Sequence, residues 1–165
     1  MQYPRTIRNF NAFINAQSYA GRVLEGKPPE VKLITANHRA GGMDGSIAQD
    51  MGIEAMKTEI TLAEWATETI KLIGTRERVT FRPGAMGQDD FSADSFVMTM
   101  GGLWSSTNFG DLKPGSDTPL KLTQETDYFR VIKNGEVLIE IDIKGGKRII
   151  GGVDQLAEMR KAMGI

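Results

Sequence analysis

The side chains that could carry out chemistry are few in this chain of 165 residues. A transition-metal site normally gathers several histidine or cysteine ligands, whereas the sequence has one histidine, His38, and no cysteine. That histidine could formally complete a Ser-His-Asp arrangement, but no G-x-S-x-G motif surrounds any serine. We therefore expect His38 to be a structural or surface residue, and we predict no metal site.

Acidic residues form two short groups that could be considered as acid–base or cation-binding sites. Glu140 and Asp142 alternate along one predicted strand, whereas the paired carboxylates of glycosidases flank a cleft from separate elements. Asp89 and Asp90 lack the spacing and the closing glutamate of a calcium-binding loop. No phosphate-binding glycine motif follows a predicted strand. The sequence therefore predicts no catalytic residue and no cofactor, and we expect a protein that is not an enzyme.

Length and composition favour an ordinary globular protein, with 40% hydrophobic and 25% charged residues. Residues 1–165 are enough for a single domain with its own core. No apolar run approaches the roughly 20 residues of a membrane-spanning helix, and the N-terminal residues lack the apolar core of a secretory signal. We expect a chain that folds in a cytoplasm and does not insert into a membrane.

Charge is balanced overall but unevenly distributed. The net charge of −1 provides no global basic surface for nucleic acid. Residues 1–39 carry six basic and two acidic side chains, a balance of +4, and residues 40–70 carry one basic and six acidic, a balance of −5. These blocks are either solvated surfaces or a basis for head-to-tail attraction between copies. The basic cluster KGGKR at residues 144–148 could contact phosphate, and a turn between charged strand ends explains it equally well.

The elements that position these residues are mainly β-strands. Residues 39–62 contain four glycines and two alternating runs, residues 46–51 and 53–62, which predict a long strand pair entered through a glycine-rich bend. The dipeptide Asn134-Gly135 predicts a type I′ hairpin turn. Further strands are predicted at residues 9–15 and 19–24 (a first hairpin), 31–35, 78–82, 92–104, 119–133, 136–144 and 148–150, with a polar loop at 83–90.

Two helices are predicted. Residues 61–64 have the form of a capping box, and the following apolar residues recur at spacings of three and four up to residue 73. Residues 62–73 should therefore form the principal helix, with one apolar face against a sheet. Residues 154–163 should form a second helix, which at about ten residues would be marginal alone in water and must dock on its own subunit or a neighbour.

Several long motifs resemble a known family. They are RAGGMDG followed by a DMGIEAM segment, then YFRVIKNGEVLIEID and IIGGVDQLAEMRKAMGI near the C-terminus. In these residues the chain resembles the major tail tube protein family of contractile phage tails and R-type bacteriocins. The resemblance implies a mainly β (α+β) fold, a β-sandwich or partly closed barrel with one flanking helix, a long extended hairpin and a short C-terminal helix. It also implies a structural protein whose hexameric rings stack into the hollow inner tube of a contractile tail, a conduit for DNA into the host.

The resemblance implies assembly sites and partners as well. The inter-ring loop would be Arg39, Ala40, Gly41, Gly42, Met43, Asp44 and Gly45, and the assembly arm would include Val153, Asp154, Gln155, Leu156, Met159 and Met163. The partners would be further copies of the chain, the tail sheath, the tape measure, and the baseplate, initiator and terminator proteins, with DNA only as transient cargo. The protein would assemble in the host cytoplasm and reside in the virion. The alternatives are a tube subunit of a bacteriocin or type VI-like secretion device, and a small β-barrel binding module or hydrolase.

Overall fold

The computed structural model describes residues 1–165 and contains twelve β-strands and two short helices. The strands are β1 (Thr6–Ile14), β2 (Gln17–Ser18), β3 (Val23–Lys27), β4 (Leu33–His38), β5 (Ile47–Ile53), β6 (Met56–Leu62), β7 (Val79–Met86), β8 (Ala93–Asn108), β9 (Leu120–Lys133), β10 (Glu136–Asp142), β11 (Lys147–Ile150) and β12 (Val153–Asp154). The helices are α1 (Thr67–Ile70) and α2 (Ala157–Met163). Neither helix is long and apolar enough to cross a membrane. The predicted mainly β fold class is confirmed.

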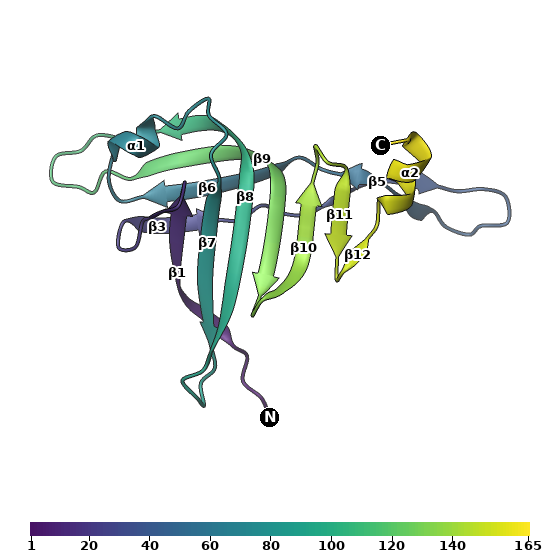
Figure 1. Cartoon of the computed structure of the whole chain (residues 1–165), viewed down its shortest axis with the longest axis horizontal. Coiled ribbons are helices and arrows are strands. Elements are labelled where there is room, and N and C mark those ends of the chain that lie inside the picture. The colour runs from purple at the N-terminus through teal and green to yellow at the C-terminus, as the bar shows by residue number, and fades with distance from the viewer.

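Ten strands form one antiparallel sheet that folds into two layers. The order is β12-β11-β10-β9-β8-β7-β1-β2, and β6 joins by pairing with β9 on one side and β3 on the other. The first half of β9 pairs with β6 and its second half with β10, while β8 lies beside both halves. Figure 1 shows β8 and β9 curving from an upright layer, with β1, β7, β10 and β11, into a crossing layer with β3 and β6. The sheet branches at β9 and ends at β12, β2 and β3, so the sandwich remains open.

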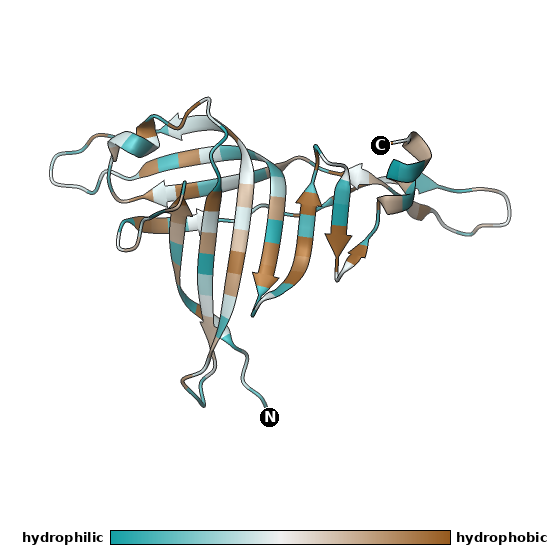
Figure 2. Cartoon of the chain, in the orientation of Figure 1, coloured by the Kyte–Doolittle hydropathy of each residue, from teal (hydrophilic) through white to brown (hydrophobic).

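The core lies between the two layers and follows strand alternation. In β6 the residues Met56, Thr58, Ile60 and Leu62 are buried and alternate with exposed or half-buried ones. Figure 2 shows the related alternation of hydrophobic and hydrophilic residues along the strands. Trp104 is buried at the centre, where its indole Nε1–H donates to the Glu77 carbonyl at 3.0 Å. Burying an indole together with its hydrogen bond avoids an unpaired polar group in the core.

The predicted helix at residues 62–73 is wrong in extent, because only Thr67–Ile70 is helical. Leu62 is instead the last residue of β6, where it is buried opposite Leu120. Thr61 is paired in the same ladder and cannot cap a helix. The alternation of β6 therefore extends to Leu62, the first residue that we assigned to the helix, and tertiary pairing overrode the local capping signal.

The predicted strand pair within residues 39–62 is also wrong. Strand β5 pairs with β4, which precedes the glycines, and β6 pairs with β3 and β9. The glycine-rich segment is therefore the turn at the end of hairpin β4–β5, and it does not lead into that hairpin. Strands β5 and β6 do not pair with each other. Glu54 and Ala55 separate them, and the two strands belong to different sheets.

The turns were predicted more accurately than the strand pairing. Asn134 and Gly135 have φ of 48° and 84°, which confirms a hairpin turn with both central residues at positive φ. The first hairpin returns for only the two residues of β2, which lie in the predicted turn. Of the predicted second arm at residues 19–24, only Val23 and Leu24 lie in a strand, β3, which pairs with β6. The predicted loop at residues 83–90 begins later, since β7 continues through Pro83 to Met86.

Candidate assembly surfaces

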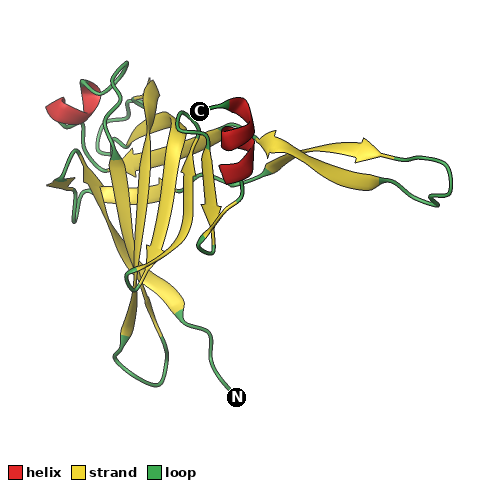
Figure 3. Ribbon diagram, turned by 45° about the vertical axis from the view of Figure 1, so that its right-hand side comes forward, coloured by secondary structure: helices red, strands yellow, loops and turns green.

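The hairpin β4–β5 and its tip, residues 39–46, form an arm that projects from the body of the molecule (Figure 3). All six residues of β4 and five of the seven in β5 are exposed. Large apolar side chains are among them, namely Leu33, Ile34, Ile47 and Met51. A two-stranded ribbon is marginally stable alone in water, and exposed apolar side chains concentrated on one element favour a contact surface. Most apolar side chains of the arm are therefore left uncovered within the subunit, although the arm has the composition of a contact surface.

The predicted loop of Arg39 to Gly45 forms the outer end of this arm. The Met43 N–H donates to the Ala40 carbonyl at 3.2 Å, and Gly42 has φ of 85°. A Cβ added at Gly41, Gly42 or Gly45 would meet no atom within 4 Å. The turn thus requires glycine for its backbone conformation at Gly42, whereas within the subunit no close approach of another backbone requires the other two.

The root of the arm is joined to the body by one ion pair. Arg148 of β11 is 5% exposed, and both of its terminal guanidinium nitrogens donate to the carboxylate of Asp50 in β5, Nη1 to Oδ1 at 3.3 Å. The hydrogen bond from Arg148, with a second from the Gly52 N–H, holds the pKa of Asp50 below its ordinary value. Sequence reasoning placed Arg148 in a basic turn cluster and missed this contact.

The predicted C-terminal assembly arm is β12 followed by α2, and we call residues 153–165 the C-terminal unit. The predicted helix start at residue 154 is wrong, because Asp154 lies in β12 and the helix begins at Ala157. Arg160 donates to Asp154 at 3.3 Å and to the Gly146 carbonyl at 2.9 Å, and this hydrogen bond to Asp154 lowers the pKa of that carboxyl. No residue of α2 is buried. Hydrogen bonds hold the unit in place, and its apolar side chains are left exposed: Val153, Met159, Met163 and Ile165.

A groove of about 580 Å³ lies between the arm root and the C-terminal unit. Met51 and Ile53 line it from β5, and Leu156 and Met159 line it from the C-terminal unit, with Arg148 among the polar residues. The arm root and the C-terminal unit therefore line one groove, whereas the predicted inter-ring loop, residues 39–45, does not line it. The tip with its glycines lies at the opposite end of the arm (Figure 3).

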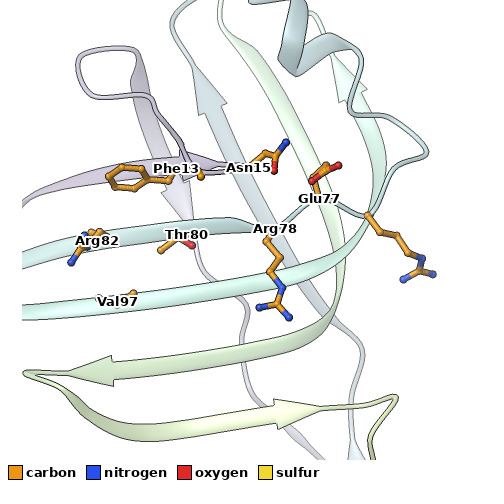
Figure 4. Close-up of a pocket in the computed structure, with 9 residues that line it drawn as sticks. Phe13, Asn15, Glu77, Arg78, Thr80, Arg82 and Val97 are labelled. Carbon is orange, nitrogen blue, oxygen red and sulfur yellow. The ribbon is translucent and has the colours of Figure 1, made fainter.

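A second groove, of about 650 Å³, lies on the body and contains three arginines. Figure 4 shows Arg78 just before β7, and Thr80 and Arg82 along it, beside Phe13 of β1 and Val97 of β8. The guanidinium of Arg78 stacks over the Tyr128 ring at 4.7 Å, and the neighbouring Arg76 donates to Asp127 at 2.7 Å. The lining residues include no histidine or serine that could serve as a base or nucleophile.

The residues first considered for chemistry are dispersed in the structure. His38 lies exposed at the end of β4. Glu140 accepts a hydrogen bond from the Tyr128 hydroxyl at 3.3 Å, and Asp142 accepts one from the Gly145 N–H at 3.0 Å in the turn before β11. Asp90 accepts hydrogen bonds from Ser92 in the turn between β7 and β8. Each of these contacts shapes a turn or a strand surface. Of the residues first considered, Asp89 and Asp90 line one shallow pocket near the N-terminus.

The model of the family described as phage tail tube protein FII matches residues 4–164 of the chain. The chain belongs to this family. The tail tube protein of Escherichia phage P2 is 29% identical over 172 aligned positions that cover 100% of both proteins. The major tail tube protein of Serratia phage KSP20 is 23% identical over 146 positions, which cover 87% of this chain and 85% of the relative.

A solved structure shares the fold of this family member. The sheath/tube terminator of the extracellular contractile injection system PVC, in its extended state, has a TM-score of 0.60 and 10% sequence identity. The superposition covers 81% of this chain and 98% of that one. At this identity the likeness concerns the fold alone.

The acidic block of this tail tube family member is largely neutralised within the subunit. Five of its six acidic residues have a basic partner within 4.0 Å. The pairs are Asp50–Arg148, Glu54–Lys32, Glu59–Lys121, Glu64–Arg22 and Glu68–Arg22. Only Asp44, at the tip of the arm, has no ion-pair partner. The uneven charge distribution therefore reflects contacts inside the chain more than a surplus offered to another copy.

Two strand edges of the body have no partner along part of their length. Strand β1 pairs with β7 on one side, but on the other side only Phe13 and Ile14 pair, with β2. The second half of β8, from Gly102 onward, pairs with β9 and with no strand on its other side, although Trp104 there accepts the Gly74 N–H at 2.9 Å and donates to the Thr75 carbonyl at 3.0 Å. Unpaired edges leave backbone N–H and carbonyl groups available for another chain.

Proposed function

We propose that this chain is the structural subunit of the inner tube of a contractile phage tail, with no catalytic role. Copies join into hexameric rings, the rings stack into a hollow tube, and DNA passes through the tube into the host. Membership of the tail tube family and the end-to-end alignment with the tail tube protein of phage P2 support the role in the tail. The fold shared with the sheath/tube terminator of a contractile injection system is consistent with a contractile tail. The protein then resides in the virion after assembly in the host cytoplasm, and residues 1–165 act as a single domain.

The observation that carries the self-assembly part of the proposal is the arm. It exposes all of β4 and most of β5, with large apolar side chains among them. A second copy that covered this ribbon would remove that apolar surface from water, which favours association. The unpaired edges of β1 and β8 add a second kind of contact, because a heterologous interface whose rotation closes produces a ring.

The two predicted sites have distinct places in this proposal. The tip, from Arg39 to Gly45, makes the contact between rings, since it lies farthest from the body along the arm. The C-terminal unit, with Val153, Met159 and Met163 exposed, contacts either the adjacent subunit or the tail sheath. The tape measure, baseplate, initiator and terminator proteins are partners of the assembled tube, and DNA is transient cargo.

The experiment compares glycine substitutions at two exposed turns. Gly42→Val, or deletion of residues 41–45, should leave a folded subunit by circular dichroism that builds no tubes in negative-stain electron microscopy. Gly115→Val is the matched control, because Gly115 also has positive φ, 75° against 85° for Gly42, and also has open space around its Cβ position. Both substitutions strain one turn by about 1–2 kcal/mol. Normal tubes from the Gly42 variant, or monomeric wild-type protein under all conditions, would contradict the proposal.

A further inference from the structure

Arg148 occupies a position in the body where the fold favours an apolar residue. It lies directly opposite Ile141, which is completely buried, in the β10–β11 ladder, so its side chain starts on the core face of the sheet. It is 5% exposed, and its Nε–H has no hydrogen-bond partner. Its only ion-pair partner is Asp50, which belongs to the arm.

Apart from this ion pair, the arm joins the body through a short connection and through two half-buried side chains, Val31 and Ile53, that pack against the core. Two single-chain segments, residues 28–32 and 54–55, lead into and out of the arm without belonging to any strand. One backbone hydrogen bond, from the Glu54 N–H to the Lys32 carbonyl at 2.8 Å, closes the joint. Just inside it, Gly52 has φ of 122°, and the β4–β5 register is irregular between Leu33 and Thr35. A joint of this kind leaves the direction of the arm weakly specified by the backbone alone.

We propose that Arg148 is a positioning residue that fixes the direction in which the arm leaves the body. Moving the arm away would leave a buried guanidinium without a counter-charge, which is strongly unfavourable. The Arg148 carbonyl also accepts the Gln155 N–H at 2.9 Å, so the same residue ties the C-terminal unit to the arm root. The consequence for assembly rests on the proposed function. An arm held in one direction places its tip at one position on the neighbouring copy.

Stability alone does not account for this ion pair. Replacing a buried ion pair by apolar residues of similar volume is often neutral or stabilising, and an apolar residue at position 148 would extend the surface of Ile141. What an apolar pair loses is directionality, because a two-pronged guanidinium–carboxylate contact holds in one geometry whereas apolar contacts tolerate sliding. Positioning and stability can therefore be separated by experiment.

The test uses the absence of native cysteine. Spin labels are attached at His38→Cys, at the outer end of β4, and at Glu136→Cys, on the exposed start of β10. Labelled protein is diluted into excess unlabelled protein, and the distance distribution between the labels is measured by pulsed electron resonance. Three backgrounds are compared with wild type: Asp50→Asn, the double variant Asp50→Leu with Arg148→Met, and Asp154→Asn. The last removes a second two-pronged arginine–carboxylate pair, Asp154–Arg160 on the C-terminal unit, and serves as the matched control.

We expect one narrow distance peak in wild type and in Asp154→Asn, and loss of that peak in Asp50→Asn and in the double variant. The double variant should keep its melting temperature, so broadening there cannot be attributed to unfolding. A narrow peak that persists in both Asp50 variants, or a broad distribution already in wild type, overturns the role of Arg148. Tubes are scored separately by electron microscopy. Failure of wild-type protein to form them contradicts the proposed function and leaves the distance result for Arg148 intact.

Discussion

The body and the arm are built from the same kind of strand but differ in what their side chains contact. In β6 of the body every second residue is buried, whereas in β4 of the arm no residue is buried. Burial of apolar surface contributes roughly 25 cal/mol per Å², so the body holds its own stabilisation. The arm has its ladder hydrogen bonds, the Asp50–Arg148 pair and Ile53 at its root, which packs against the core. The subunit is therefore stabilised mainly by its body, while most side chains of the arm are left exposed.

The largest expected effect lies in the body. Trp104→Ala removes a side chain that is 1% exposed and leaves the Glu77 carbonyl without its indole donor. Loss of such a side chain should lower the free energy of unfolding by about 3–5 kcal/mol, measured by urea denaturation. A loss below about 1 kcal/mol would mean that the space between the two layers is not a packed core.

Two glycines allow the backbone packing of the body to be compared with that of the arm. A Cβ at Gly102 of β8 would lie 1.9 Å from the Glu125 carbonyl oxygen of β9, whereas a Cβ at Gly41 of the arm tip would meet nothing within 4 Å. Gly102→Ala should therefore separate β8 from β9 and destabilise the subunit by about 1–3 kcal/mol. Gly41→Ala should change the free energy of unfolding by less than about 0.5 kcal/mol. Equal effects at the two glycines would remove the distinction between body and arm.

The same contrast explains what could be predicted from the sequence. Strands with strong alternation or a diagnostic turn were located well, as with the 14 residues of β9 and the turn at Asn134-Gly135. The pairing partners of the strands were not predicted well. Alternation specifies which face of a strand is buried, but it does not specify which strand lies beside it. Residues 47–53 and 56–62 both look like strands, yet the first belongs to the arm and the second to the body.

The sequence also predicted only part of the candidate sites. The glycine-rich tip and the C-terminal residues were identified by resemblance to the tail tube family, and their exposure fits a surface role. The contact of Arg148 with Asp50 joins residues 98 positions apart, so no local pattern reveals it. One signal existed: in Lys147–Ile150, Arg148 shares a strand face with Ile150, and a charged residue on that face needs a partner from elsewhere.

Acid should weaken the contact between arm and body. The folded-state pKa of Asp50 is lowered by the Arg148 hydrogen bond, so its stabilisation is present above the unfolded-state pKa of about 3.9. It is lost as the pH falls through the lower folded-state value. The difference in unfolding free energy between wild type and Asp50→Asn, followed by urea denaturation from pH 7 downward, should be constant at first and shrink below about pH 4. Because the Asp50 side chain is 40% exposed, the effect is small.

Asp44→Asn is the control for this pH series, because Asp44 lies at the arm tip without an ion-pair partner. Its difference from wild type should be smaller than that of Asp50→Asn at every pH above about 5. A difference for Asp50→Asn that grows toward acid pH would reverse the expected sign, and would mean that the carboxylate is not stabilised by Arg148 in the folded state.

Substitution of the apolar side chains of the arm should have the smallest effect on the free energy of unfolding of the subunit. It gives the most direct test of the difference between body and arm. Ile34 and Ile47 are 45% and 61% exposed, and threonine keeps the β-branched shape that suits a strand. The double variant Ile34→Thr and Ile47→Thr should therefore change the free energy of unfolding by no more than about 0.5 kcal/mol. Leu112→Thr, at a side chain 73% exposed in the loop between β8 and β9, is the matched control.

Assembly should respond to these variants very differently. If neighbouring copies cover the arm, each apolar contact is repeated at every interface, so a loss that a single subunit tolerates accumulates along the tube. Sedimentation and negative-stain microscopy should show tubes from wild type and from Leu112→Thr, and only small species from the double arm variant. Should the arm variant form tubes at the wild-type protein concentration, the exposed apolar residues of the arm would not be buried by assembly. Its order in the tube would then have to come from the tip and from the contact of Asp50 with Arg148.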